Sequence, residues 1–341
     1  MRIKLLRASL LGASLLAGVA VTGAAWGWGS TGHRLVGEEA LRALPAYAPA
    51  FLRSPAGIAD VGEYAREPDR WRGSGKVHDN ERDPAHFIDL DDDGKTLGGL
   101  SLDELPATRS DYEAALRARS IEPGKAGYLP YATVDMWQQV TKDMAYWRVL
   151  TLMEGRETDA SKKAWYRADR IRREDLTLRD IGILAHYMGD ATQPLHLSIH
   201  YNGWGDFPNP QGFTTEKVHV PLEGPYVGAN ITAADVRAHV GAYTPCTDKI
   251  ELCVTARLKR SYQQVIPMYQ LEKDGGFKDG DPRGKAFMAE RLGQGASDLR
   301  DALLDAWRES KTQGVGYPAA SYDDFVAGKV ADPWALLYGN D

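Results

Sequence analysis

Residues 178–196 read Leu-Arg-Asp-Ile-Gly-Ile-Leu-Ala-His-Tyr-Met-Gly-Asp-Ala-Thr-Gln-Pro-Leu-His. Residues 178–190 predict a helix that is apolar on most sides, which is typical of a helix in the centre of a bundle. His186 and Asp190 are four residues apart, so a helix places both side chains on one face, where one metal ion could bind them. Pro194 must kink or interrupt the helix, and the kink would let His196 serve a neighbouring metal. The stretch therefore predicts a central helix that carries part of a metal site.

Other segments predict further helices around this one. Apolar residues at spacings of three and four indicate helices over residues 35–44, 131–153, 256–272 and 286–307. Ser30 and Thr31 are candidate N-caps for the first of them. Strand signals are few, and the best candidate is the short run 218–222. Residues 201–212 are rich in Gly, Pro and Asn and predict an irregular surface loop. We expect a mainly α fold, a single-domain multi-helix bundle with few short strands.

Composition bounds the class of protein. The chain has 341 residues, of which 43% are hydrophobic and 26% charged, so it can bury a sizeable core. No repeat or low-complexity linker divides it, and residues 28–341 are expected to form one domain. The formal net charge of −6 argues against a duplex-DNA binder that works by phosphate neutralisation, which needs a basic face. It leaves room for a cleft in which bound cations govern the local field.

The start of the chain predicts export. Three basic residues in the first seven positions, an apolar run at 10–21 and small residues at 23–27 indicate a signal peptide over residues 1–27, with a retained membrane anchor as the alternative. No later apolar run is long enough to cross a bilayer, so no membrane span is expected in the mature chain. We expect a periplasmic or secreted monomer. In an oxidising compartment Cys246 and Cys253 favour a disulfide over two buried thiols.

Three more motifs accompany the run from His186 to His196. They are Trp-Gly-Ser-Thr-Gly-His at 28–33, His-Phe-Ile-Asp at 86–89 and His-Val-Pro-Leu-Glu at 219–223. Together with an aspartate, Asp69, they resemble the family that joins S1/P1-type nucleases and bacterial zinc-dependent phospholipase C. The matches follow the family's order over about the first two-thirds of the mature chain. Each motif alone is weak, but the ordered set is specific.

The resemblance implies a multi-helix fold of the phospholipase C/P1 nuclease type that binds three zinc ions. The first ion would be held by Asp69, His86, His186 and Asp190; the second by Asp190, His33 and the amine and carbonyl oxygen of Trp28; the third by His196, His219 and Glu223. Asp69 matches the family's aspartate by its spacing to His86, and Asp60 is the alternative. A free amine at Trp28 requires cleavage after Gly27. The other three histidines are expected to be surface or core residues: His78, His200 and His239. Of these, His200 is near enough in sequence to contact the ligands.

The implied reaction is hydrolysis of a phosphodiester by zinc-activated water. Asp190 would bridge two ions and Asp69 would accept a proton, so both are candidate catalytic residues. In the nucleases of this family the motif at 86–89 contacts a base, which implies stacking by Phe87 and hydrogen bonding by Asp89. We therefore expect an endonuclease for single-stranded DNA and RNA, with 3'-nucleotides as further substrates.

Two other functions remain open at this point. Glu223 and the stretch Pro-Gln-Gly-Phe at 210–213 are closer to the phospholipase branch, so a phospholipase C for phosphatidylcholine-like lipids is the alternative. Trp-Gly-x-x-Gly-His at the expected mature start is closer to the nuclease branch. A zinc-binding or helical interaction protein without turnover is the third possibility.

Overall fold

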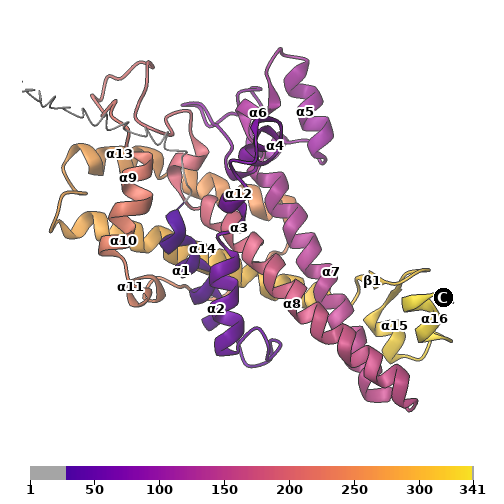
Figure 1. The fold of residues 1–341 in the computed structure, drawn as a ribbon. Helices are drawn as coiled ribbons and strands as arrows, with labels where there is room; N and C mark the ends of the chain where they lie inside the picture. Colours follow the sequence, from indigo (N-terminus) through magenta and orange to yellow (C-terminus); the bar gives the residue numbers. More distant parts are fainter. Residues whose placement is uncertain (1–27, 340–341) are drawn as a thin grey trace, which may run out of the picture.

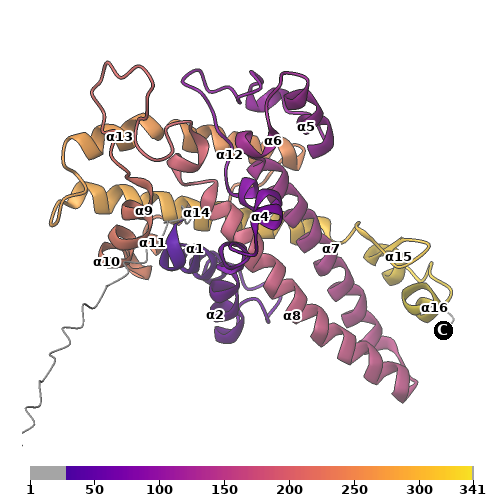
Figure 2. The same cartoon turned by 45° about the horizontal axis from the view of Figure 1, so that its top comes forward.

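Two long helices, α7 (Leu129–Arg156) and α8 (Ala160–Asp190), lie side by side and antiparallel, and most other elements pack around one end of this pair (Figures 1 and 2). The computed structural model describes residues 28–339, so the expected leader at 1–27 lies outside the described residues. The side chain of Asp159 caps the first turn of α8 by accepting from the backbone N–H groups of Ser161 and Lys162. Residues 178–190 form the C-terminal part of α8 and are almost entirely buried, as the sequence predicts.

Short and medium helices make up most of the remaining structure. They are α1 (Gly29–Arg42), α2 (Pro55–Tyr64), α3 (Glu67–Arg70), α4 (Lys76–Arg82), α5 (Arg109–Arg117), α6 (Pro123–Ala126), α9 (His219–Pro221), α10 (Val227–Asn230), α11 (Ala233–Arg237), α12 (Ile250–Tyr262), α13 (Val265–Lys273), α14 (Pro282–Glu309), α15 (Tyr322–Val326) and α16 (Pro333–Tyr338). Single turns of 3₁₀ or π helix are η1 (Asp83–His86), η2 (Leu102–Glu104), η3 (Pro194–Leu197) and η4 (Leu222–Tyr226). The strands β1 (Gly314–Val315) and β2 (Ala320–Ser321) pair antiparallel. The prediction of a mainly α fold with few short strands is confirmed.

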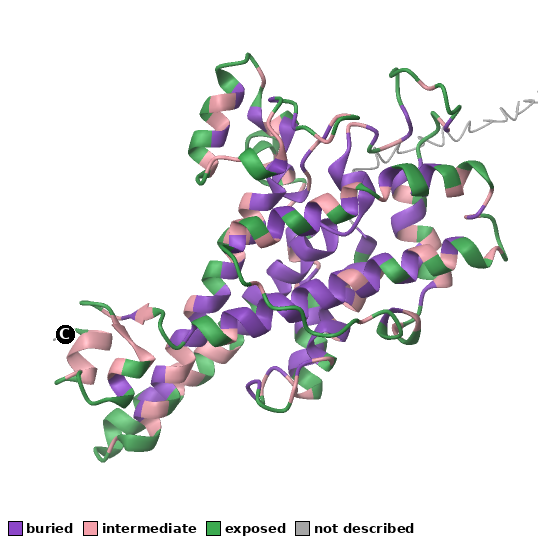
Figure 3. Ribbon diagram, turned by 180° about the vertical axis from the view of Figure 1, so that it is seen from behind, coloured by how far each residue is buried: buried purple, intermediate pink, exposed green. Residues whose placement is uncertain are grey.

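The main core lies where α1, α2, α7 and α14 pack around the C-terminal half of α8. Figure 3 shows that buried residues concentrate in this part of the molecule. The indole N–H of Trp137 on α7 donates to the carbonyl of Ala302 on α14 at 2.9 Å, which ties two of these helices together through a buried polar contact. The aromatic stripe of α7 therefore serves packing.

A second, smaller core lies at the far end of α7 and α8. Val149, Leu150 and Tyr166 from this end pack against Val315 and Phe325 from the C-terminal elements β1 and α15. Figure 1 shows these elements, in yellow, beside the tip of the helix pair. We call this part, residues 312–339 with the adjoining ends of α7 and α8, the distal tip.

Two helix boundaries differ from the sequence-based expectation. Ser30 and Thr31 lie inside α1 and are not its caps, because the chain enters the helix directly from Trp28, which makes no side-chain cap. The single helix expected over 256–272 is two helices, α12 and α13, interrupted near Gln263. Pro267 explains the interruption, because its ring would clash with the carbonyl of Gln263 in a continuous helix.

The strand expected over 218–222 is wrong. These residues form α9 and the start of the π-helical turn η4. Pro221 has no N–H to give to a strand ladder, and Gly224 and Pro225 follow it directly. The helical turn instead brings Glu223 back to His219, and the two side chains contact each other.

Three other expectations concern the surface of the molecule. Cys246 and Cys253 are joined in a disulfide, as predicted. Residues 201–212 form an irregular loop, as predicted, although Trp204 within it is buried. Within residues 28–339 no helix combines the length and the apolar character needed to cross a bilayer.

Candidate metal centre

Five short stretches of chain converge on the C-terminal end of α8. The side chains they bring together are His33 from α1, Asp69 from α3, His86 from η1, His186 and Asp190 from α8, His196 from η3, and His219 and Glu223 from α9 and η4. Each of these residues is at most 5% exposed. Among the described residues they form three overlapping groups whose donor atoms lie close enough to hold metal ions. We call this set the metal cluster.

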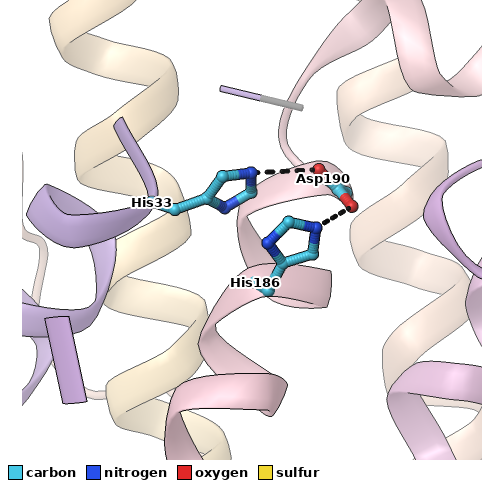
Figure 4. A group of neighbouring side chains, drawn as sticks. All are labelled: His33, His186 and Asp190. Carbon is cyan, nitrogen blue, oxygen red and sulfur yellow. Dashed lines mark ion pairs between the residues drawn. The ribbon is translucent and has the colours of Figure 1, made fainter. Parts of the chain in front are cut away.

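Asp190 lies at the middle of the metal cluster. Its Oδ2 lies 3.2 Å from Nε2 of His186 and 3.1 Å from Nδ1 of His86. Its Oδ1 lies 3.5 Å from Nε2 of His33, and Figure 4 shows how His33 and His186 approach the two oxygens from different elements. The two rings are stacked with centroids 3.8 Å apart. One carboxylate therefore faces two sets of imidazoles, as a carboxylate that bridges two ions would.

His196, His219 and Glu223 form a second part of the cluster. Oε1 of Glu223 lies 3.2 Å from Nε2 of His196 and 2.8 Å from Nε2 of His219. The two Nε2 atoms are themselves only 3.1 Å apart. Nδ1 of His196 also lies 3.7 Å from Oδ1 of Asp190, so this part adjoins the first.

Backbone carbonyls fix the orientation of these imidazoles. Nδ1 of His186 lies 2.8 Å from the carbonyl of Ala65, and Nδ1 of His219 lies 2.7 Å from the carbonyl of Tyr201. Nδ1 of His196 lies 2.6 Å from the carbonyl of His86. A carbonyl oxygen only accepts, so each Nδ1 must carry the proton and each neutral ring presents a bare lone pair at Nε2. Carbonyl partners of this kind typically orient histidines that bind a metal.

The lone pairs of His196 and His219 consequently face each other and the carboxylate of Glu223. Three electron-rich atoms this close repel one another unless a cation lies among them. Burial lowers the pKa of His196, but Asp190 and Glu223 outweigh it and raise the pKa to about 9. The arrangement thus demands positive charge, supplied either by a proton or by a metal ion.

The other buried ionisable groups respond to burial and to one another. Burial would raise the pKa of Asp190, but His186 and His196 hold it well below its usual value. Burial lowers the pKa of His86 to about 3, so its ring stays neutral and can donate a lone pair at ordinary pH. Burial raises the pKa of Asp69. The cluster therefore combines the neutral imidazole of His86 with an ionised central carboxylate.

Several buried polar atoms of the cluster have no hydrogen-bond partner among the described residues. They are both ring nitrogens of His33, Oδ1 of Asp69, Oδ1 of Asp190 and Oε2 of Glu223. Buried polar atoms are normally paired, so this concentration of unpaired donors and acceptors requires an explanation. Metal ions held between them would provide the missing partners.

Trp28 and Asp69 lie at the cluster, whereas Asp60 does not. The indole of Trp28 is fully buried and donates to the carbonyl of Gly189 at 2.7 Å, beside His33. Its carbonyl accepts from the N–H of Gly32 at 3.2 Å and keeps a second lone pair. Asp69 is buried with Oδ1 4.0 Å from Nε2 of His186. Asp60 is exposed on α2, so the geometry favours Asp69 as the early aspartate.

Phe87 and Asp89 follow His86 on an extended segment that pairs with the loop before α7. The carbonyl of Phe87 accepts from Leu129, and the N–H of Asp89 donates to Ala126. Gly127 is required here, because a Cβ on it would lie 2.2 Å from the Phe87 carbonyl oxygen. Burial raises the pKa of Asp89 to about 7, although the charge of His196 acts to lower it. Both side chains are half-buried, which suits contact with a ligand.

The remaining histidines lie outside the cluster. His200 anchors the 201–212 loop: its Nδ1 donates to the carbonyl of Trp204 at 2.9 Å and its Nε2 lies 2.8 Å from Oδ1 of Asp92. His78 lies half-buried beside Asp79, and His239 is exposed. These positions agree with surface or core residues.

Two residues that lie at the cluster were not predicted from the sequence. Gln193 is fully buried; its Nε2 donates to Oε1 of Glu223 at 2.6 Å, and its Oε1 accepts from the N–H of Leu195 at 2.9 Å. Arg72 lies 3.6 Å from Oδ1 of Asp69. Their positions in the sequence, three residues after Asp190 and three after Asp69, are the only signal that could have indicated them.

No protein-family model matches this chain, and the curated proteins searched contain no significant match.

Proposed function

We propose that this protein is a zinc-dependent phosphodiesterase, an endonuclease that hydrolyses single-stranded DNA and RNA, with 3'-nucleotides as further substrates. The observation that carries the proposal is the pair of Nε2 atoms of His196 and His219, 3.1 Å apart and both against Oε1 of Glu223, an arrangement that requires positive charge between them. This pair adjoins two further groups that share His186, one of which contains Asp190. Clusters of divalent ions joined by a carboxylate are typical of enzymes that cleave phosphate esters.

Zinc fits the donor set better than other common ions. Imidazole nitrogens outnumber carboxylates in the cluster, a mixture that suits zinc, whereas calcium and magnesium prefer oxygen ligands. The cluster also carries three buried carboxylates, Asp69, Asp190 and Glu223, so it has strong negative charge to be neutralised. We propose three sites, with the division of ligands that the family resemblance implies and with Trp28 completing the site of His33.

Bound zinc would supply Lewis acidity toward a phosphate and would lower the pKa of water. The protein's own residues would orient the reaction. Asp190 would hold its two oxygens toward different groups of imidazoles, and the buried Asp69, whose pKa is raised by burial, is suited to accept a proton. Phe87 would stack on an unpaired base and Asp89 would hydrogen-bond to it, a mode of binding that selects single strands.

The structure also bears on the phospholipase alternative. Phe213, in the stretch that favoured a lipid substrate, is buried and packs against Trp204 and Tyr269. Phe213 therefore packs within the molecule, so this sequence feature has a structural role and carries less weight for a lipid substrate. The preference for a nucleic acid continues to rest on the motif at residues 28–33.

The proposal is tested by assaying protein that begins at Trp28 on single-stranded DNA, RNA and phosphatidylcholine, with and without a chelator. We expect chelator-sensitive hydrolysis of the nucleic acids, restored by added zinc. H186A removes a ligand from two groups and should abolish activity and lower the zinc content, whereas H239A, at an exposed histidine, should change neither. Hydrolysis of lipid alone would overturn the nuclease proposal, and no chelator-sensitive hydrolysis of any of the three would overturn both enzyme functions.

The role proposed for Trp28 has its own test. Protein that keeps one residue before Trp28 has no free amine at that position and should be inactive. It should also bind less zinc than protein that begins at Trp28. Equal zinc content and equal activity in the two forms would show that the amine is not a ligand.

A further inference from the structure

A cleft of about 800 Å³ lies beside the metal cluster. Its lining comes from the loop after η2 and from parts of α7, α8 and α12, and its volume lies within the range of small-molecule sites. Ala85 and Tyr187 belong to its lining. The ring of Tyr187 lies 5.9 Å from that of His86 and 5.7 Å from that of His186, so a single side chain separates the cleft from the cluster.

Arginines extend from the cluster along this cleft. Arg72 bridges two carboxylates, with Nη1 3.6 Å from Oδ1 of Asp69 and Nε 3.2 Å from Oδ1 of Asp83. Arg82 is the neighbour of Asp83 and lines the cleft, stacked over Trp71 with its guanidinium carbon 4.9 Å from the ring centroid. Positive charge thus continues from the edge of the metal cluster into the cleft.

Arg109 is a further arginine in the lining of the cleft. It stacks over Tyr128 at 3.6 Å and lies 3.7 Å from Oε2 of Glu81, next to Arg82. Its Nε also donates to Glu113 at 2.7 Å, so Arg109 is held in place from two sides. Glu113 and Glu81 face the edge nitrogens of Arg109, so Arg109 adds positive charge to this side of the cleft but its N–H groups are already engaged.

Arg82 is the cation most available to a ligand. It is exposed, and no carboxylate of residues 28–339 lies within ion-pair distance of it. Acidic residues of the cleft limit how many phosphates it can hold: Asp103 is paired with Lys259, but Asp135 on α7 and Glu251 on α12 have no ion pair among the described residues. The balance of charge leaves room for a single phosphate in the cleft, on the side where Arg82 lies.

We propose that this cleft binds the nucleotide next to the scissile phosphate of a single-stranded substrate. Arg82 contacts the phosphate of that nucleotide, and the base packs among the aromatic side chains Trp71, Tyr131 and Tyr187 that line the cleft. Stacking of this kind accepts any base that is not paired. The proposal rests on the nuclease function proposed above and assigns a second nucleotide position, separate from Phe87 and Asp89.

The test compares substrates of different length. The kcat/KM is measured for an octanucleotide and for a 3'-nucleotide, which has no second nucleotide to fill the cleft, with the zinc-loaded protein and its variants. R82A removes a charge-assisted contact with phosphate, so the ratio of the two kcat/KM values should fall about tenfold. The loss should appear in KM for the octanucleotide and should shrink as salt is raised. A107W, which adds a large side chain at an exposed loop position of the cleft lining, should change the ratio in the same direction.

The matched control is R167A. Arg167 is an exposed arginine on α8 near the distal tip, 3.9 Å from Glu154, and its removal should leave the ratio unchanged. Zinc content and melting temperature verify that each variant is folded. An unchanged ratio in both R82A and A107W would overturn the second nucleotide position while leaving the nuclease function intact. Wild-type protein that hydrolyses only lipid, and loses that activity in A107W, would overturn both and assign the cleft to an acyl chain.

Discussion

Gln193 orients a carboxylate of the metal cluster without being one of the candidate ligands. Its amide donates to Oε1 of Glu223, the same oxygen that faces His196 and His219. The N–H of Leu195 fixes which way the amide points, because it can donate only to the amide oxygen. Gln193 therefore holds Glu223 in position. Its N–H group also partly offsets the negative charge of that carboxylate.

We predict that Q193A lowers zinc affinity at the group of His196, His219 and Glu223 by about 10- to 100-fold, the usual cost of removing a partner that orients a ligand. Competition with a chelator, together with the number of zinc ions bound per chain, measures the effect. Q193E should lower the zinc affinity further, because it places a second carboxylate against Glu223.

The control is Q270A, which removes an amide from an exposed pair, Gln270 and Asp274, on the surface of α13. It should bind zinc as the wild type does. If Q193A keeps full zinc content and affinity, Gln193 serves only the packing of the turn.

At the residue scale, the sequence predicts which side chains meet, but it does not predict how they are oriented. The spacing of His186 and Asp190 places them together because a helix repeats its faces every three to four residues. His33 and His86 come from distant parts of the chain, and only the ordered set of motifs indicated them. The carbonyls that fix the imidazoles belong to Ala65, His86 and Tyr201, and a carbonyl leaves no signature in sequence.

At the scale of elements, the end of α8 approaches α1 very closely at Gly189. A Cβ on Gly189 would lie 3.0 Å from Nδ1 of His33 and 3.3 Å from Cδ1 of Trp28. We predict that G189A shifts His33 away from Asp190 and weakens zinc binding at the proposed site of His33. Zinc stoichiometry and the melting temperature with added zinc would report the change.

Gly155 offers the matched control, because it also lies near the end of a long helix, α7, and a Cβ there would meet nothing within 4 Å. G155A should leave zinc binding intact and should stabilise the fold by about 0.4–1 kcal/mol by restricting the unfolded chain. Equal zinc binding by G189A and G155A would contradict the close approach of α8 to α1.

A buried pair of carboxyl groups joins α7 to α8. Burial and the neighbouring Asp180 raise the pKa of Asp143 to about 7, although Arg173 lies 2.8 Å from its Oδ1 and lowers it. The folded protein then binds a proton that the unfolded chain releases near pH 4, so this group stabilises the fold at low pH. The contribution is lost as the pH rises through about 7.

We predict that D143N, whose amide can donate to Asp180 as the protonated acid does, unfolds at higher denaturant concentration than the wild type at pH 8. The gain should be larger at pH 8 than at pH 5 by about 1 kcal/mol or more, because the folded wild type already carries its proton at pH 5, and it should vanish only below about pH 4, where the unfolded chain is protonated as well. Urea unfolding at the two pH values measures it. A gain of equal size at both pH values would show that the proton on Asp143 is not its cause.

The long helices were predictable because their apolar spacing runs over many turns, as in α7 and α14. The short elements were not. Residues 218–222 are apolar and β-branched enough to indicate a strand, and only contact between His219 and Glu223 reveals the helical turn. Pro267 was visible in the sequence, yet its effect on α12 depends on the helix that precedes it, so the interruption was missed.

At the scale of the whole molecule, two hydrophobic cores share the helices α7 and α8. The metal cluster lies in the main core, whereas Phe325 belongs to the distal tip. We predict that F325A destabilises the distal tip by about 3–5 kcal/mol. Hydrogen exchange should become faster in residues 312–339 and in the adjoining ends of α7 and α8, with zinc content unchanged.

L299A is the matched variant in the main core, where Leu299 of α14 is fully buried. It should accelerate exchange around the metal cluster and reduce zinc affinity. Loss of zinc from F325A as well would mean that the two cores unfold together as one cooperative unit.

The distal tip also suggests how the protein could be fixed to a solid support. Lys163 is exposed at the start of α8, and His186 lies 23 residues further along the same helix, a distance of about 35 Å. A linker attached at this lysine would hold the metal cluster well away from a bead or an electrode, at the opposite end of a rigid rod. Immobilised in this way, the protein should keep its cleft facing the solution, where long substrates can reach it.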